Sequence, residues 1–404
     1  MGKFVDKVLR ALVAITFRDL ILLPGLSEVE PSEIDVRTKV SANHELNIPL
    51  VSSPMDTVTE AEMAIALARQ GGLGVLHRNC TIEEEVEMAK KVKRAESFII
   101  RDVITIRPDR TVGEAMEIMR RHDISGLPVV DDAGRLVGIV TARDVRFTDP
   151  SLKVLDVMTR EEDLITVGEG ITIEEAKRIL QAHRIEKLPV VDEQGRLRGL
   201  ITVKDIMLRG RFPNAVRDEE GRLLCAAAVS PFDLKRAVEL DRWVDILVVD
   251  VAHFHNRNCF EATKKLLKHV GADVIVGNIG TYKAAEDAIT ELDGIAGFRV
   301  GIGSGSICIT MDLLKAGSPT LFATAQVADA VSDYGADLPI IADGGIRNPG
   351  DVALALALGA SCAMMGNVFA GCREAPGELV AIGGRYFKRY RGMASPSARA
   401  KRHA

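Results

Sequence analysis

The sequence lacks paired cysteines. Its six cysteines include no Cys-x-x-Cys pair, which excludes the common zinc-binding patterns and a disulfide framework: Cys80, Cys225, Cys259, Cys308, Cys362 and Cys372. Unpaired thiols are typical of a reducing compartment, so we expect a cytoplasmic protein. Cys225 and Cys362 lie in apolar runs, where a small buried side chain is the simplest interpretation.

Long apolar runs and a basic excess are also missing. No apolar run reaches the length of a membrane span, and the segment from Met1 to Phe17 lacks the apolar core of a secretory signal. The formal net charge is −5 at pH 7, so there is no basic excess to displace counterions from nucleic acid. We therefore expect neither a membrane nor a nucleic-acid partner. With 404 residues, 47% of them hydrophobic and 27% charged, the sequence is that of a globular protein with two or three domains.

An internal repeat organises the middle of the chain. Three segments recur at a constant offset of 61 residues: 102–106 as 163–167, 127–131 as 188–192, and 138–144 as 199–205. Between the first two segments of each repeat, a Thr-x-x-Glu capping box predicts the start of a helix, at Thr111 and at Thr172. Each repeat is therefore predicted to run strand, helix, strand, turn, strand, helix.

This pattern resembles a pair of CBS domains (a Bateman module) over residues 97–209, with repeats at about 97–150 and 156–209. The resemblance implies that an adenine or guanine nucleotide binds in the cleft between the repeats, with ribose and phosphate held by Thr141, Asp144, Thr202 and Asp205. The alternative is that these residues only cap the following helices and that the module is a scaffold.

The flanking residues 1–96 and 210–404 predict a barrel. Eight short apolar runs alternate there with helical stretches: 48–53, 73–77, 224–229, 245–250, 274–277, 298–302, 338–342 and 362–365. Such alternation predicts right-handed βα units and a parallel sheet. An open doubly wound sheet is the alternative, but its Gly-x-Gly-x-x-Gly fingerprint is absent after the first strand. We therefore predict a (β/α)₈ TIM barrel interrupted by the tandem CBS module.

In such a barrel the active face lies at the carboxyl ends of the strands. Polar residues occupy the predicted strand ends, and we expect them to converge although they are far apart in sequence: Ser53, His77, Asp250, Asn278, residues 303–310, Asp343 and Asn367.

The loop after the sixth predicted strand is rich in glycine and carries a cysteine. Gly301, Gly303 and Gly305 allow tight bends whose backbone groups suit a phosphate or a cation. Cys308 follows them within a Gly/Ser/Thr context, outside any strand. A thiol presented at the start of a helix can be held as the nucleophilic thiolate, so Cys308 is the candidate nucleophile.

Two further loops favour a nucleoside monophosphate. Asp343 precedes Gly344 and Gly345, and Gly366 precedes Asn367, after the seventh and eighth predicted strands. These loops form the usual phosphate-binding site of a barrel, and Asp343 is placed to accept hydrogen bonds from ribose hydroxyls.

These motifs resemble the inosine-5′-monophosphate dehydrogenase and GMP reductase family. The matching segments are 47–59, 301–310, 341–346, 374–377 and 390–393, and the CBS pair falls where that family places it. The resemblance implies oxidation of IMP to XMP by NAD⁺: Cys308 attacks C2 of the purine, a hydride leaves to NAD⁺, and water releases the product.

The resemblance also implies a role for each site residue. The phosphate would be held by Ser306, Gly345, Gly366, Asn367 and Tyr390, and the ribose by Asp343. The nucleotide pocket would be lined by Ser53, Met55, Gly392 and Met393, and the nicotinamide faced by Asp250, Asn278, Gly301 and Gly303. Thr310 would lie beside the attacking water. A monovalent cation, K⁺, would bind the carbonyls of Gly303, Gly305 and Cys308, and the family's assembly predicts a homotetramer or octamer.

The sequence departs from the family in three places. Ala394 and Asn367 replace a usual glycine and serine. The family's mobile flap, whose Arg-Tyr pair activates water, follows the Tyr390–Met393 motif, whereas the sequence ends at Ala404. On this sequence alone we expect covalent attack and hydride transfer to proceed and hydrolysis to be slow.

Two alternatives remain at this stage. GMP reductase shares the barrel and the cysteine loop but reduces GMP with NADPH; the Asp250-Val-Ala-His253 segment favours the dehydrogenase. The other is a nucleotide-sensing CBS protein whose barrel serves only for assembly.

Overall fold

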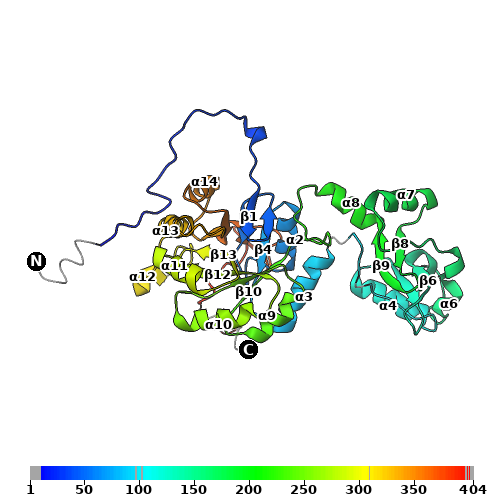
Figure 1. The fold of residues 1–404 in the computed structure, drawn as a ribbon. Helices are drawn as coiled ribbons and strands as arrows, with labels where there is room; N and C mark the ends of the chain where they lie inside the picture. Colours follow the sequence, from blue (N-terminus) through cyan, green and yellow to red (C-terminus); the bar gives the residue numbers. More distant parts are fainter. Residues whose placement is uncertain are drawn as a thin grey trace, which may run out of the picture. The chain divides into compact units, whose positions relative to one another are not determined.

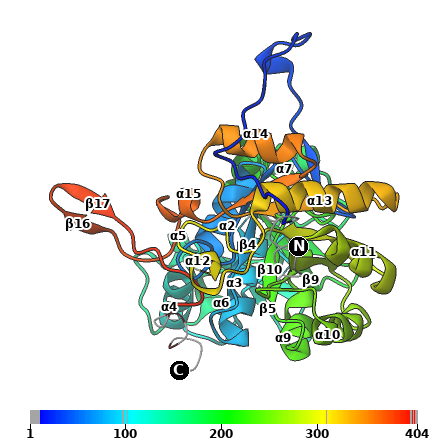
Figure 2. The same cartoon turned by 90° about the vertical axis from the view of Figure 1, so that its left-hand side faces the viewer.

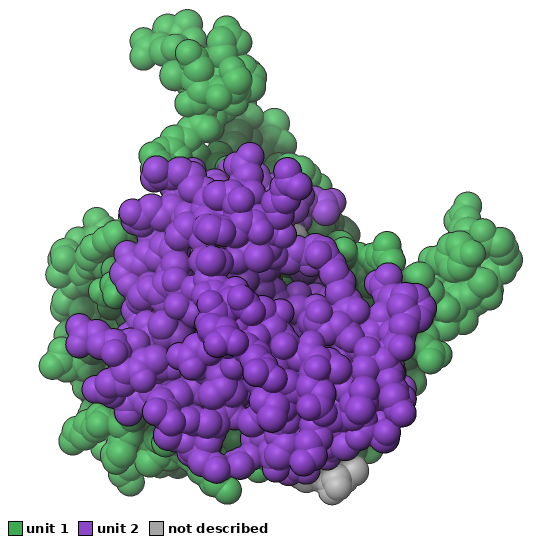
Figure 3. Space-filling model, turned by 90° about the vertical axis from the view of Figure 1, so that its right-hand side faces the viewer, with its two compact units in different colours: residues 1–95, 214–404 green, residues 96–213 purple. Residues whose placement is uncertain are grey.

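The structure is a computed structural model that describes residues 11–95, 98–101, 103–308, 310–395, 398 and 400. At positions 205, 208 and 209 it describes the backbone only. Asp102 of the first repeat and Ile309 of the cysteine loop therefore lie outside the described residues. The chain divides into two compact units, residues 1–95 with 214–404, and residues 96–213 (Figure 3).

Eight parallel strands close into a barrel in the first unit (Figure 1). In barrel order they are β10 (Ala226–Val229), β11 (Ile246–Val249), β12 (Asp273–Ile279), β13 (Ile295–Val300), β14 (Ile340–Asp343), β15 (Cys362–Met365), β3 (Leu50–Ser52) and β4 (Leu73–Leu76). Each predicted apolar run overlaps one of these strands, so the predicted TIM barrel is confirmed. The strands are mostly apolar, and β10 and β11 are entirely so, because both faces of the sheet are covered, the inner one by the barrel core and the outer one by helices.

Helices follow the strands and surround them (Figure 2). They are α2 (Ala61–Arg69), α3 (Ile82–Arg94), α9 (Leu234–Asp241), α10 (Arg257–Leu267), α11 (Tyr282–Glu291), α12 (Thr310–Leu314), α13 (Thr320–Asp333), α14 (Pro349–Ala357) and α15 (Asn367–Ala370). The interior cluster includes Val51, Val75, Ile246 and Ile341, all at 0% exposure. A second cluster joins β14 and β15 to α13 and α14.

Two hairpins of the first unit were not anticipated from the sequence. β1 (Thr38–Ser41) and β2 (His44–Leu46) pair antiparallel and bury Val40 and Leu46 in the barrel core. Asp273, at the start of β12, accepts hydrogen bonds from this hairpin, which therefore closes the amino end of the barrel. β16 (Val380–Ile382) and β17 (Arg385–Phe387) form an exposed hairpin that projects from the barrel (Figure 2).

The second unit repeats one backbone pattern. The first repeat holds α4 (Val112–His122), β5 (Gly126–Val130), β6 (Leu136–Thr141) and α5 (Ala142–Val145); the second holds α7 (Ile173–His183), β8 (Lys187–Val191), β9 (Leu197–Thr202) and α8 (Val203–Arg211). Both predicted capping boxes form, and each repeat has its own core cluster. A short helix, α6 (Val154–Val157), and strand β7 (Thr159–Arg160) lie between the repeats.

The predicted first strand of each repeat is wrong. Within residues 103–106 and 163–167, only single bridges form, from Ile106 to Val129 and from Val167 to Val190. The apolar residues of these segments pack into the two cores, but only one residue of each segment pairs with the sheet, so no ladder forms.

Candidate active site

A cavity of about 1100 Å³ opens at the carboxyl ends of the barrel strands. All barrel residues predicted for the site except His77 line it: Ser53, Met55, Asp250, Asn278, Gly301, Gly303, Gly305, Ser306, Cys308, Thr310, Asp343, Gly345, Gly366, Asn367, Tyr390, Gly392 and Met393. They come from the carboxyl ends of six different strands, from the loops that follow these strands, and from the segment that follows β17. The barrel thus brings together residues separated by more than 300 positions.

His77 is the exception to the predicted convergence. Its side chain is 1% exposed, contacts Glu60 at 3.3 Å and accepts a hydrogen bond from the backbone N–H of Asn79 at 3.1 Å. It lies along a different cavity, beside Cys80. A polar residue at a strand end can be buried by its own βα loop, and here the loop after β4 turns His77 away from the site.

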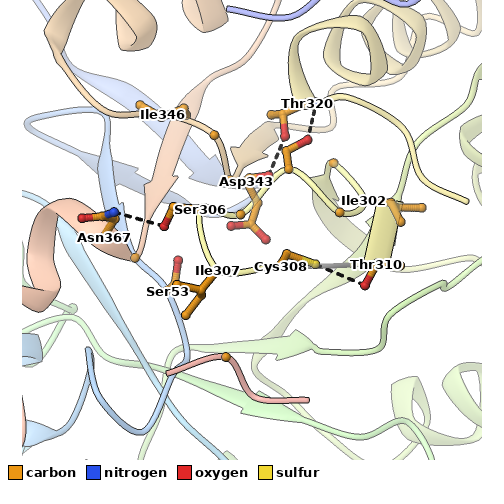
Figure 4. A pocket seen from close by; sticks show the side chains of 18 of the residues that line it. Ser53, Ile302, Ser306, Ile307, Cys308, Thr310, Thr320, Asp343, Ile346 and Asn367 are labelled. Atoms are coloured by element: carbon orange, nitrogen blue, oxygen red, sulfur yellow. Dashed lines mark hydrogen bonds between the residues drawn. The ribbon is translucent and has the colours of Figure 1, made fainter. Parts of the chain in front are cut away.

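The cysteine loop is fixed by close backbone packing. Gly301 has φ = +121°, and a Cβ there would lie 2.5 Å from the Asp343 carbonyl oxygen, so only glycine fits. Thr320 ties the loop to β14, because its backbone N–H donates to Ser304 Oγ at 3.0 Å and its hydroxyl to the Asp343 carbonyl at 2.7 Å (Figure 4). The loop therefore presents Cys308 on a rigid base.

Cys308 differs from the other thiols. All six cysteines lie in the described part of the chain, and Cys308 is the one that is exposed. Burial raises the pKa of Cys80 and of Cys225 to about 12, which keeps them as inert thiols. Cys308 Sγ lies 3.2 Å from Thr310 Oγ1, within hydrogen-bond reach and facing the cavity (Figure 4). The geometry supports the prediction of Cys308 as the nucleophile.

Arg299 joins the two acidic residues of the site. This β13 side chain donates to Asp250 at 2.7 Å and to Asp343 at 2.9 Å, and it is 7% exposed. Asn278 donates from Nδ2 to Asp343 at 3.0 Å. Burial alone would raise the pKa of Asp250, but the charges of Arg299 and Arg78 outweigh it and lower the pKa. Asp250 therefore stays ionised and in a fixed orientation.

Sequence reasoning missed Arg299 and Arg78. A usable signal was present for Arg299, since a single charge interrupts the apolar run 298–302, and a buried charge requires a partner. Arg78 donates from Nη2 to the Asp250 carbonyl at 2.8 Å and from Nε to its carboxylate at 3.3 Å. Nothing in the sequence around Arg78 predicts that contact.

At the other end of the cavity, side chains lie close to the backbone of Gly366. A Cβ on Gly366 would lie 2.8 Å from Tyr390 Oη and 3.1 Å from Met55 Sδ. Asn367 Nδ2 donates to Ser306 Oγ at 3.1 Å (Figure 4). Burial raises the pKa of Tyr390, so its hydroxyl remains a neutral donor. Neutral donors and backbone groups thus surround this end.

An ion pair holds the segment that carries Tyr390. Arg391 binds the Asp56 carboxylate through both Nε, at 3.2 Å, and Nη2. Asn79 Nδ2 donates to the same carboxylate at 2.8 Å. Burial would raise the pKa of Asp56, but the hydrogen bonds from Arg391 and Asn79 lower it. This clamp, Asp56–Arg391, fixes the residues on either side of Arg391 against the cavity.

The predicted cation site is a set of carbonyls. The Gly305 carbonyl accepts the Cys308 amide at 2.9 Å. The carbonyls of Gly303 and Cys308 accept no backbone hydrogen bond from the described residues, so they are available as oxygen ligands. Within the described part of the chain no cluster of His, Cys, Asp or Glu could hold a metal ion. A carbonyl cradle fits a monovalent cation better than a transition metal.

In the second unit, two of the predicted nucleotide residues contact each other. The backbone N–H and the hydroxyl of Thr141 both donate to Asp144 Oδ2 at 2.7 Å, which is the capping arrangement. Thr202 is the equivalent residue of β9, and the side chain of Asp205 lies outside the described part of the structure.

Lys187 lies near both turns. It pairs with Thr202 in the β8–β9 ladder, and its Nζ donates to Ser125 Oγ at 2.8 Å, beside Gly126, which pairs with Thr141. Burial lowers the pKa of Lys187. A partly buried amine therefore lies between the two Thr-x-x-Asp turns.

Comparison with known proteins identifies the family. The IMP dehydrogenase / GMP reductase domain matches residues 14–404. Inosine-5′-monophosphate dehydrogenase from Korarchaeum cryptofilum is 59% identical over 393 residues, covering 97% of this chain and 81% of the relative. The enzyme of that name from Methanocaldococcus jannaschii is 50% identical over 400 residues, covering 98% and 79%.

Solved structures agree with this result. The structure of a GMP reductase variant from Trypanosoma brucei in complex with guanosine 5′-monophosphate is 36% identical and superposes with a TM-score of 0.91, covering 98% of this chain and 85% of that one. By sequence and by fold, the chain belongs to the IMP dehydrogenase / GMP reductase family.

Proposed function

We propose that this chain oxidises IMP to XMP with NAD⁺ through a covalent intermediate on Cys308. The observation that carries the proposal is the exposed Cys308 thiol in the one cavity where the loops of Asp343, Gly345 and Gly366 also meet. The high identity to relatives named inosine-5′-monophosphate dehydrogenase supports it.

The nucleotide would lie along the cavity with its phosphate away from Cys308. Ser306, Gly345, Gly366, Asn367 and Tyr390 supply hydroxyls, an amide side chain and backbone N–H groups for the phosphate. Asp343, already oriented by Arg299 and Asn278, would accept the ribose hydroxyls. Ser53, Met55, Gly392 and Met393 would line the walls around the base.

The chemistry has two halves. The Cys308 thiolate adds to C2 of the hypoxanthine, and the hydrogen on C2 leaves with its electron pair as a hydride. Bound NAD⁺ would supply the acceptor for that hydride. A water oxygen then adds to C2 and the C2–S bond breaks, which gives XMP and restores the thiol. Thr310 would lie beside this water, because its Oγ1 is 3.2 Å from Cys308 Sγ.

The acidic pair would orient the redox partners. Asp250 and Asn278 line the cavity together with Gly301 and Gly303, and they would face the nicotinamide. Because Arg299 and Arg78 hold Asp250 ionised, it can accept hydrogen bonds from the nicotinamide side of NAD⁺ without taking up a proton.

GMP reductase is the second candidate, because the matching solved structures carry that name. An absorbance assay separates the two: mixing with IMP and NAD⁺ should produce NADH, at least one equivalent per Cys308. Mixing with GMP and NADPH should give no change, and Cys308→Ala should abolish NADH formation. Consumption of NADPH with GMP, without NADH from IMP, would refute the proposal.

We further propose that K⁺ binds the carbonyls of Gly303, Gly305 and Cys308 and stiffens the cysteine loop. Replacing K⁺ with Li⁺ in the assay should then slow NADH formation, because the smaller ion cannot contact all three carbonyls. An unchanged rate in both salts would refute the cation site.

For the second unit we propose an adenine or guanine nucleotide at the Thr141/Asp144 and Thr202/Asp205 turns. The amine of Lys187 supports this, since it lies between the turns and suits a phosphate. Titration calorimetry with ATP and GTP should show binding that Lys187→Ala weakens. If neither nucleotide binds, the proposed nucleotide site is refuted and the unit acts as a scaffold.

The assembly proposed from the family is a homotetramer or an octamer, and the proposed location is the cytoplasm. Light scattering at micromolar concentration tests the first, and cell fractionation the second. In the described residues no helix is both long and apolar enough to span a bilayer.

A further inference from the structure

Only arginines contribute positive charge to the lining of the active-site cavity in the described residues: Arg18, Arg299 and Arg347. Arg299 is neutralised by Asp250 and Asp343, and Arg347 contacts Asp351 at 3.3 Å. Arg18 differs, because its guanidinium has no ion pair or hydrogen bond to any described residue. It is therefore the uncompensated cation of the cavity.

The backbone of Arg18 is held in place although its side chain is exposed. Phe17 is 8% exposed and packs in the cluster of Leu321, Ala342 and Ile346. On the other side, Asp19 Oδ2 accepts hydrogen bonds from the Thr16 backbone N–H and hydroxyl, both at 2.7 Å. The turn between them presents Arg18 to the cavity at a fixed position.

That position is next to the phosphate end. A Cβ on Gly345 would lie 3.5 Å from Phe17 Cδ2, so Phe17 lies directly against the glycine that we place at the phosphate. The other groups at this end, including Ser306, Asn367 and Tyr390, are neutral donors. A nucleoside monophosphate brings close to two negative charges, and Arg18 is the adjacent cation free to meet them.

We propose that Arg18 donates hydrogen bonds to the 5′-phosphate of the bound nucleotide and sets the preference for nucleotide over nucleoside. This inference rests on the proposed function. NAD⁺ also carries phosphate, but the contact of Phe17 with Gly345 assigns Arg18 to the monophosphate.

The test is calorimetric binding of single ligands, without turnover, to the full chain and to Arg18→Gln and Arg18→Lys. Arg18→Gln should weaken IMP binding about 3- to 30-fold and reduce its salt dependence, while inosine binding stays within about twofold. Arg18→Lys should recover part of the loss. Arg37→Gln is the matched control, since Arg37 is exposed on the same segment but outside the cavity, and it should bind IMP as the parent does.

Three outcomes would overturn the inference and leave the proposed function intact. IMP affinity could be unchanged in Arg18→Gln. Inosine could lose as much affinity as IMP, which would mean that Arg18 acts through the fold of its turn. The loss could be confined to NAD⁺, which would assign the cation to the pyrophosphate. A parent chain that binds neither IMP nor GMP would refute the proposed function itself, and the inference with it.

Discussion

Replacing Asp56 with asparagine should weaken IMP binding without slowing the chemical step. Asp56 contacts no ligand; it holds Arg391, and Arg391 lies between Tyr390 and Gly392, which line the cavity. Loss of the clamp frees this segment, so part of the binding energy must be spent to order it again. Asp56 is thus a positioning residue, and its removal should raise the KM for IMP and leave kcat nearly unchanged.

The magnitude follows from the contacts. Hydrogen bonds to charged groups contribute about 1.5 to 3 kcal/mol. The lower end of this range applies for two reasons. The Asp56 side chain is fully buried, but its partner Arg391 is 19% exposed, which weakens the charged contact. The asparagine side chain also keeps one oxygen that can still accept a hydrogen bond from Arg391. About 1 to 1.5 kcal/mol corresponds to a roughly 5- to 10-fold weaker Kd for IMP.

The pH dependence of this effect has a definite sign. Because the pKa of Asp56 is lowered in the folded protein, the stabilisation that its carboxylate gives to the Arg391 segment is complete above the ordinary aspartate pKa of about 3.9. That contribution disappears only as the pH falls through the lower folded value. The loss of IMP affinity caused by Asp56→Asn should therefore be constant from about pH 6 to 9.

The assay is calorimetric IMP binding combined with the first-turnover rate of NADH formation. Asp56→Asn, Arg391→Gln and the double variant form a mutant cycle, and the double variant should lose no more than the worse single one. Asp35→Asn is the control, because it breaks an exposed Asp–Arg pair outside the cavity. Additive losses, or a slower first turnover at saturating IMP, would refute the positioning role.

Three further predictions test the site and the domain organisation. Cys308→Ala should abolish covalent trapping by a C2-electrophilic purine nucleotide while IMP still binds, and Cys372→Ser should trap normally; mass spectrometry reads both. Gly366→Ala should weaken IMP binding by at least tenfold, because the new Cβ would lie 2.8 Å from Tyr390 Oη, and a normal Kd would contradict the close approach. Joining the ends after deletion of residues 96–213 should leave a barrel that unfolds cooperatively, and a non-cooperative melt would show that the two units share a core.

The barrel could be predicted because its strands are short, apolar and separated by helices. That pattern depends on local sequence alone, and so do the glycine-rich loops at the strand ends. The convergence of Cys308, Asp343 and Gly366 then follows from closure of the barrel.

Long-range polar contacts could not be predicted in this way. Arg299 and Asp250 are 49 residues apart and Asp56 and Arg391 are 335 residues apart, and no local pattern encodes either pairing. The predicted first strands of the repeats were wrong for a related reason. Apolar content indicates that Ile165 and Val167 pack against a core, but only the packed structure decides whether their segment pairs with a sheet.

Strand β4 pairs directly with β10, although roughly 150 residues lie between them. Closing so long a loop would cost about 2 kcal/mol more in chain entropy than closing a connection of about 20 residues between neighbouring barrel strands. The cost falls if the intervening segment has already collapsed into its own cores, because the effective loop is then only the two short connections. Lys93 Nζ, 2.9 Å from Asp218 Oδ2, fastens those connections together once they meet. If the insert folds first, mutations that slow folding of the repeats should delay assembly of an active site to which they contribute no residue.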